Sequence, residues 1–297
     1  MNTEKILLIV NPVAGTGQSR TALFGILSEL CADNRPVTVM MTAGAGDATR
    51  LAEEFGGEYK TLACVGGDGT LSEILSGVMA LTQDKRPDIG YIPMGTANDM
   101  AATFQLSGDP ETAAKTVVKG EATSVDIGRL EDKYFGYVAA FGAFTEVSYS
   151  TPQDLKNTFG HLAYVFEGAK SVPQIKPIKV KIEHDGGVIE GEYIYGGVTN
   201  SLSLGGLMKL NPEDVDLSDG LLELLLVKAP KSAAELQKAV FGILTQNYNG
   251  DEVVLLHTKK AHFTFFEPVA WTRDGEAGGE YREVTAENIR QAVKIIM

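Results

Sequence analysis

The chain has 297 residues, about the length at which a single hydrophobic core usually gives way to two domains. Its composition is ordinary for a globular protein, with 44% hydrophobic and 22% charged residues. The formal net charge of −13 argues against nucleic acid as a partner, and no basic cluster is available for anionic lipid headgroups. Contact with a membrane would therefore have to be apolar or transient.

Cysteine usage and the apolar runs predict a cytoplasmic protein. Cys31 and Cys64 lack the spacing of a metal site, which favours reduced thiols. The run at 6–10 is too short for a signal peptide, and no stretch approaches the roughly 18 apolar residues of a membrane-spanning helix. No transmembrane anchor is therefore expected.

The first 120 residues alternate between strand and helix patterns. Strands are expected at 6–10, 37–41, 62–65 and 89–92, because these are short apolar runs. Helices are expected at 21–30, after an Asp47 cap, at 70–81, from about 97, and after Asp109-Pro110. This alternation predicts an α/β domain with a parallel sheet over residues 1–124.

The pattern changes near residue 123. Two strands at 178–182 and 188–195 flank Asp185-Gly186 and predict a hairpin. Further strands are expected at 221–227, 253–256 and 261–266, with helices at 154–170 and 232–248. Residues 125–284 are therefore predicted to be a mostly antiparallel β domain. The piece at 293–296 is a candidate to return to the first domain, which 285–297 would then complete.

A glycine-rich turn, Gly66-Gly67-Asp68-Gly69-Thr70, follows the third strand and opens a helix. Glycines let a backbone approach phosphate, and the amides of the following helix face the anion. Asp68 could hold magnesium that the phosphates bridge. The turn is not a P-loop, and Ser72 at the third glycine position of a dinucleotide fingerprint makes a dehydrogenase a weak alternative. An ordinary glycine turn with an Asp cap is the structural alternative.

Two further turns follow neighbouring strands. Asn-Pro-Val-Ala-Gly at 11–15 follows the first strand, and Pro-Met-Gly-Thr-Ala-Asn-Asp at 93–99 follows the fourth. Each alone could be a plain strand-to-helix turn. Because the carboxyl ends of parallel strands meet at one edge, three such turns would converge on one ligand.

Two acidic turns occur later in the chain. Asp216-Leu217-Ser218-Asp219-Gly220-Leu221 could offer carboxylate and carbonyl oxygens to a hard cation, although an acidic hairpin turn is the simpler interpretation. Asp274-Gly275-Glu276 is either a turn with solvated acids or a means of aiming Glu276 at a substrate hydroxyl as general base.

Taken together, these motifs resemble the diacylglycerol kinase catalytic family, in particular its soluble bacterial lipid kinases. The matching segments are 11–15, 66–70, 93–99, 218–220 and 274–276, in this order over nearly the whole chain. The resemblance implies ATP bound between an α/β nucleotide domain and a C-terminal β-sandwich, with Mg²⁺ and a lipid substrate at the membrane surface. It also implies transient peripheral association with the membrane and a homodimer.

The resemblance also implies roles for specific residues. It implies that Glu276 is the proton acceptor and that Asp68 organises the catalytic magnesium. A second, structural magnesium would use Asp219, with Asp216 and Leu221 contributing main-chain oxygens, and Asp126 would connect the water network between the domains to that ion. The implied nucleotide contacts are Asn11, Pro12, Val13, Ala14, Gly15, Thr42, Gly66, Gly67, Asp68, Gly69, Thr70, Leu71, Ser72 and Thr96.

The chain departs from the family pattern at three places. The family commonly has Asn where this chain has Ser72, and it often has Asn near Tyr137, where this chain has none. The residues after Asp-Gly-Glu, 277–280, also follow the family pattern less closely than expected. Two other functions therefore stay open: a kinase for a soluble acceptor such as NAD, and a nucleotide-binding regulator without turnover. The lipid itself could be diacylglycerol, another glycerolipid, a sphingoid base or a polyprenol.

Overall fold

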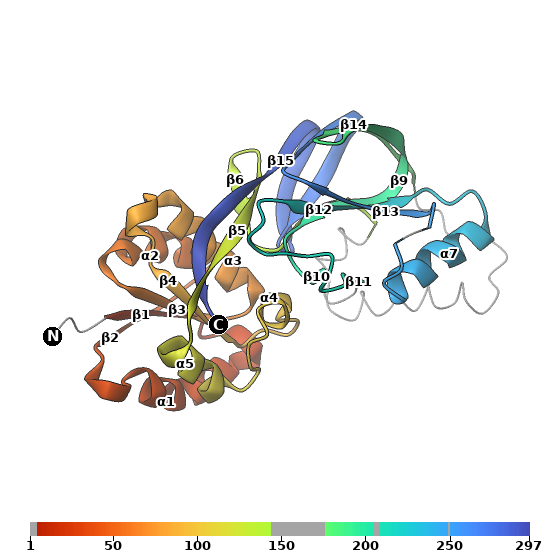
Figure 1. Cartoon of the computed structure of the whole chain (residues 1–297). Coiled ribbons are helices and arrows are strands. Elements are labelled where there is room, and N and C mark those ends of the chain that lie inside the picture. Colours follow the sequence, from red (N-terminus) through yellow and green to blue (C-terminus); the bar gives the residue numbers. More distant parts are fainter. Residues whose placement is uncertain (1–4, 144–175, 205–207, 249) are drawn as a thin grey trace.

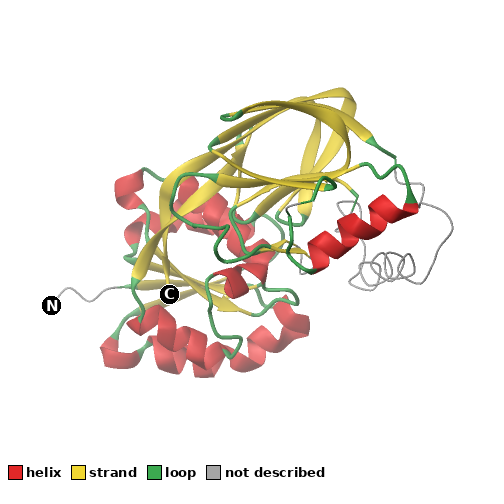
Figure 2. Ribbon diagram, turned by 45° about the vertical axis from the view of Figure 1, so that its right-hand side comes forward, coloured by secondary structure: helices red, strands yellow, loops and turns green. Residues whose placement is uncertain are grey.

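The computed structural model describes residues 5–143, 176–204, 208–248 and 250–297. Figures 1 and 2 show one part in which helices flank a small sheet and another part built mainly of strands. One sheet path runs through both parts, in the order β13-β12-β9-β7-β14-β15-β4-β3-β1-β2. The helix predicted at 154–170 lies outside the described residues.

Four neighbouring strands of the first part run parallel to one another. They are β1 (Ile6–Val10), β2 (Val37–Met41), β3 (Thr61–Gly66) and β4 (Asp88–Pro93). β1 and β3 are buried along their whole length, which explains why their sequences are continuous apolar runs. Because the four strands run the same way, their carboxyl ends lie at one edge of the sheet.

Helices cover both faces of these strands. The α-helices are α1 (Gln18–Leu30), α2 (Asp47–Phe55), α3 (Asp68–Ala80), α4 (Asp99–Thr103) and α5 (Pro110–Lys119). Short 3₁₀ helices are η1 (Ala14–Gly17), η2 (Ala32–Asn34), η3 (Gly56–Glu58) and η4 (Gln83–Lys85). α1 and α5 pack with Leu8 of β1 on one face, and α2 and α3 pack with Leu7 and Ile9 on the other.

One predicted helix cap is wrong. α2 begins at Asp47 itself, its N-cap is Gly46 with φ +81°, and the Asp47 carboxylate turns back to accept from the amides of Ala43 (2.7 Å) and Gly44 (3.2 Å). The cap predicted for α5 is confirmed, because Asp109 Oδ2 accepts from the Thr112 amide at 2.8 Å. The two aspartates differ in direction, because Asp109 binds forward to its helix and Asp47 binds back to the preceding loop.

The second part consists mainly of antiparallel strands. They are β5 (Ala122–Leu130), β6 (Lys133–Phe135), β7 (Val138–Gly142), β8 (Ile178–His184), β9 (Gly187–Thr199), β10 (Ser203–Leu204), β11 (Met208–Lys209), β12 (Leu222–Lys228), β13 (Val253–Thr258), β14 (Lys260–Arg273) and β15 (Glu276–Ile296). The hairpin predicted around Asp185-Gly186 is confirmed as β8 and β9. The predicted helix at 232–248 is α7 (Ala233–Leu244), with Ser232 as its N-cap.

Two features join the parts. Strand β15 pairs with β14 at its start and lies parallel to β4 at its end, where Ile295 is opposite Ile89 (Figure 1). One hydrophobic core also extends across both parts, with Met100 of α4, Tyr137 and Leu225 of β12 among its buried members. A separate aromatic cluster of Phe141, Phe263, Phe265 and Trp271 fills the interior of the strand-rich part.

Candidate active site

The predicted turns lie side by side at the carboxyl edge of the parallel strands. The Asn11 amide donates to Val65 O (2.8 Å), the Thr42 amide to Val10 O (2.9 Å) and the Met94 amide to Gly66 O (2.7 Å). The Asn11 side chain then donates to Thr70 Oγ1 at 3.0 Å, which links the first turn to the glycine-rich one. The convergence of these turns follows from the parallel pairing of β1 to β4.

The glycine-rich turn packs directly against the 93–99 turn. A Cβ added at Gly67 would stand 3.0 Å from the Cα of Gly95, and one added at Gly66 would stand 2.6 Å from Thr70. Glycine is therefore required here for packing, in addition to leaving the backbone open to an anion. Helix α3 begins immediately afterwards at Asp68, so its first amides face the same region.

Asp68 connects the two turns. Its Oδ2 accepts from the Asp99 amide at 3.0 Å, and its Oδ1 accepts from the Met100 amide at 3.1 Å. The carboxylate thus caps α4, which begins at Asp99 instead of near residue 97. Burial raises the pKa of the Asp68 carboxyl above its ordinary value, against the lowering effect of these two amides. Two backbone amides thus hold the Asp68 carboxyl in place at the base of the site.

Asp274 anchors the late Asp-Gly-Glu turn. This carboxyl is 4% exposed and accepts from the amides of Gly136, Tyr137 and Val138 at 2.6 to 3.0 Å. Its Oδ2 also accepts from Ser72 Oγ of α3 at 2.6 Å. These amides lie at the break between β6, which ends at Phe135, and β7, which begins at Val138. Ser72, although a departure from the family pattern, ties the two parts of the chain together.

Glu276 follows Asp274 at the turn between β14 and β15 and is exposed. A Cβ added at Gly69 would stand 3.9 Å from Glu276 Oε1, so this carboxylate lies beside the first turn of α3. Desolvation raises the pKa of Glu276, and the charges of Glu73 and Asp274 raise it further while Arg273 lowers it. The strand-rich part thus places a carboxylate opposite the glycine-rich turn.

The contact between Ser72 and Asp274 yields a testable prediction. We expect Ser72→Ala to lower the melting temperature by a few degrees and kcat/KM by about tenfold, because a hydrogen bond to a buried carboxylate contributes about 1.5–3 kcal/mol. Calorimetry and initial rates of the purified variant measure both effects. Ser107→Ala, which alters an exposed hydroxyl that accepts from Asp109 N, is the control. Wild-type stability and rate in Ser72→Ala would contradict the assignment.

The remaining residues predicted to contact the nucleotide differ in how exposed they are. Val13 is 68% exposed, Pro12 O accepts from Arg20 Nε at 3.1 Å, and Thr96 is exposed on the partner turn. Ala14 and Gly15 begin the 3₁₀ turn η1. Leu71 is completely buried in the core, so only its backbone could reach a nucleotide.

The predicted metal loop, 216–221, is held by the buried Asp126. Asp126 Oδ2 accepts from the Gly220 amide at 2.7 Å and from Asn288 Nδ2 at 3.0 Å, and its own amide donates to Leu217 O. Within the loop, Asp219 Oδ1 accepts from the Leu221 amide and Asp216 Oδ1 accepts from Ser218. Asp126 therefore contacts the loop directly.

The oxygen donors of this loop fit a hard cation. The Asp219 carboxylate and the main-chain oxygens of Asp216 and Leu221 are the ligand types that Mg²⁺ takes, usually with water, and Leu221 O already accepts from Asn288 Nδ2 at 2.7 Å. Next to them, Asn288 Oδ1 and both carboxyl oxygens of the buried Glu223 have no hydrogen-bond partner among the described residues. Within those ranges, no group of three or more His, Cys, Asp or Glu side chains is arranged to hold a metal. A cation on the loop would need main-chain and water ligands.

Sequence reasoning missed several residues that build the site. Asn98 was expected only as part of a turn, yet its Oδ1 accepts from the Gly95 amide at 2.9 Å. Asp99, 3% exposed, accepts from Ser203 Oγ at 2.5 Å across the two parts. Glu73 binds the loop before α2. Asn98 and Asp99 had only the signal of polar residues at a strand-to-helix turn, and Glu73, within α3, had none.

A glycine-rich turn at a helix N-terminus, faced by a carboxylate from the strand-rich part, is typical of a phosphoryl-transfer site. The diacylglycerol kinase catalytic domain model matches residues 5–130, and the YegS C-terminal NAD kinase beta sandwich-like domain model matches residues 138–297. The chain belongs to the diacylglycerol kinase family.

Individual relatives cover nearly the whole chain. A diacylglycerol kinase of Bacillus subtilis (strain 168) is 33% identical over 278 residues, which cover 93% of this chain and 91% of that protein. One from Staphylococcus aureus (strain MRSA252) is 34% identical over 280 residues, covering 93% and 87%. A crystal structure of a diacylglycerol kinase from Bacillus anthracis str. Sterne has a TM-score of 0.79 at 26% identity and covers 100% and 97%. None of the helices in the described ranges has the length and apolar character needed to cross a bilayer.

Proposed function

We propose that this protein is an ATP-dependent lipid kinase that phosphorylates a primary hydroxyl of diacylglycerol or a related lipid. The observation that carries the proposal is the position of Glu276, which the strand-rich part places beside Gly69 on the glycine-rich turn. Family membership and relatives named diacylglycerol kinase support lipid as the acceptor.

The chain's own residues suggest how transfer would proceed. The backbone of Gly66, Gly67 and Gly69 would bind the phosphates at the start of α3. Glu276 would accept the proton of the attacking hydroxyl. Ser72 and Asp274 would hold Glu276 in place, since their hydrogen bond joins the two walls of the site. Positioning and charge neutralisation would supply most of the rate.

Magnesium is part of the proposal at two places. Asp68 would hold it beside the phosphates, through water, because both carboxylate oxygens already accept amide hydrogens. The loop with Asp216, Asp219 and Leu221 would hold a second, structural ion. When bound, Mg²⁺ neutralises charge that develops on the phosphates.

The remaining assignments are also proposals. The division at residue 124, with 285–297 joined to 1–124, is supported by the pairing of β15 with β4. Residues 125–284 would then form the lipid-binding sandwich. We further propose a cytoplasmic protein, dimeric as the family resemblance implies, that meets its lipid transiently at the membrane surface.

A direct assay tests this function. The protein is incubated with Mg²⁺ and ATP labelled in the γ-phosphate, with diacylglycerol, a sphingoid base or a polyprenol in mixed micelles, and with NAD in solution. We expect label on a glycerolipid. Label on NAD alone would contradict the lipid assignment. ATP-dependent thermal stabilisation without labelled product on any acceptor would instead indicate a regulator and overturn the kinase assignment.

A further inference from the structure

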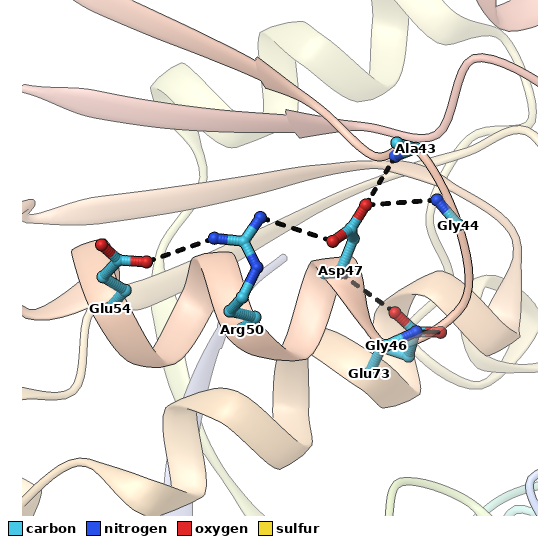
Figure 3. A network of polar contacts seen from close by, with 8 residues as sticks. Ala43, Gly44, Gly46, Asp47, Arg50, Glu54 and Glu73 are labelled. Atoms are coloured by element: carbon cyan, nitrogen blue, oxygen red, sulfur yellow. Dashed lines mark hydrogen bonds and ion pairs between the residues drawn. The ribbon is translucent and has the colours of Figure 1, made fainter.

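The segment 42–48, which comprises the loop after β2 and the first two residues of α2 and is called the 42–48 loop below, borders the candidate site and is held by two carboxylates (Figure 3). Asp47 Oδ2 accepts from the amides of Ala43 and Gly44. Glu73, which comes from α3, accepts from the Gly46 amide at 2.8 Å through Oε1 and from the Ala48 amide at 3.1 Å through Oε2. Four amides of this short loop are therefore satisfied by acidic side chains.

The bonds of Glu73 act between two elements. Gly46 is in the left-handed region, at φ +81°, where the backbone turns sharply to begin α2. Its amide and that of Ala48 are first-turn donors that have no partner within the helix. A carboxylate from another helix serves as their cap, and the Thr49 hydroxyl adds a bond to Glu73 O at 2.9 Å. The loop is thus attached to the second turn of α3.

Glu73 follows Ser72 on α3, and this position links the 42–48 loop to the Asp-Gly-Glu turn. Ser72, the preceding residue, bonds to Asp274 on the opposite wall. α3 therefore carries adjacent side chains that hold both the 42–48 loop and the Asp-Gly-Glu turn. The charge of Glu73 also reaches Glu276, whose pKa it raises second only to desolvation.

We propose that Glu73 is a positioning residue of the phosphoryl-transfer site. Its side chain fixes the 42–48 loop against α3, so this side of the ATP site is already ordered before ATP binds. This inference rests on the proposed nucleotide site, because Thr42 stands at the start of the loop and its amide joins it to the end of β1. Four amides of the 42–48 loop already donate to carboxylates, so they are not available to bind phosphate. The phosphates would instead bind the backbone of the turn at 66–69. A loop ordered in advance lowers the entropic cost of binding.

Three variants test the proposal. Glu73→Ala removes both acceptors, whereas Glu73→Gln keeps one oxygen and places an NH₂ group opposite the second amide. Glu54→Ala is the matched control: Glu54 is 54% exposed and pairs with Arg50 in the same network, but it binds no loop amide (Figure 3). Each variant is examined by amide hydrogen exchange of peptides covering 42–49 and by calorimetric titration with ATP and Mg²⁺.

We expect Glu73→Ala to speed exchange of the Gly46 and Ala48 amides at least about tenfold and to weaken ATP binding about tenfold. Glu73→Gln is expected to lie between wild type and Glu73→Ala, and Glu54→Ala to match wild type. In the lipid assay, KM for ATP should rise more than kcat falls. Exchange or ATP affinity in both Glu73 variants equal to that of Glu54→Ala would overturn the proposal.

The test separates this inference from the proposed function. Hydrogen exchange and ATP titration need no acceptor, so they report on Glu73 even if no lipid is phosphorylated. If Glu73→Ala fails to fold, Glu73→Gln decides: faster loop exchange with weaker ATP binding supports the proposal, and wild-type values of both contradict it.

Discussion

Asp68→Ala is expected to abolish phosphate transfer, with a loss of at least about 10³-fold in kcat/KM. The carboxylate lies at the start of α3 and accepts from the Asp99 and Met100 amides, so it fixes the neighbouring turn, and in the proposed site it would also supply a charge beside the phosphates. Burial raises its pKa, so activity that needs the ionised form should also decline at acidic pH. Initial rates with labelled ATP measure the loss.

Two variants separate the charge of Asp68 from its capping bonds. Asp68→Asn keeps an oxygen for one amide but removes the charge, and we expect it to be nearly as inactive as Asp68→Ala. Asp109→Ala removes a comparable cap from α5 and should cost about 1 kcal/mol of stability while leaving activity within twofold. Near wild-type turnover in Asp68→Asn would show that the charge is not needed.

The first part of the fold is readable from the sequence because its signals are local. Strands β1 and β3 are buried on both faces, so their apolar runs mark them. Parallel pairing then brings the turns after the strands to one edge. The proximity of Asn11 and the glycine-rich turn at Gly66 therefore follows from the strand pattern alone.

The contacts that complete the site could not be read in this way. Ser72 and Asp274 are separated by 202 positions, and no periodicity relates them. Asp47 has the local signature of a cap, but its carboxylate binds the preceding loop, and Glu73 on another helix accepts from the Gly46 and Ala48 amides. Such contacts depend on how the elements pack, so a residue's type indicates what it can bind and only the fold decides which partner it finds.

Glu276→Gln tests the proposed proton acceptor, and we expect it to lower kcat/KM by about 10²-fold or more. Glutamine keeps the size of the side chain but cannot accept the proton of the attacking hydroxyl. Glu280→Gln, an exposed acid further along β15, is the control and should leave the rate within twofold. A Glu276→Gln rate like that of the control would remove Glu276 from the mechanism.

The pH dependence offers an independent check on the same residue. Glu276 must be ionised to act as a base, and desolvation, Glu73 and Asp274 raise its pKa above the ordinary value of 4.5, while Arg273 opposes them. Activity should therefore be full above the raised pKa and fall as the pH drops through it, so the acid limb of kcat/KM lies above pH 4.5. Glu73→Gln removes one of the raising charges and should move this limb to lower pH. A limb that stays in place in Glu73→Gln and persists in Glu276→Gln would assign the titration to another group.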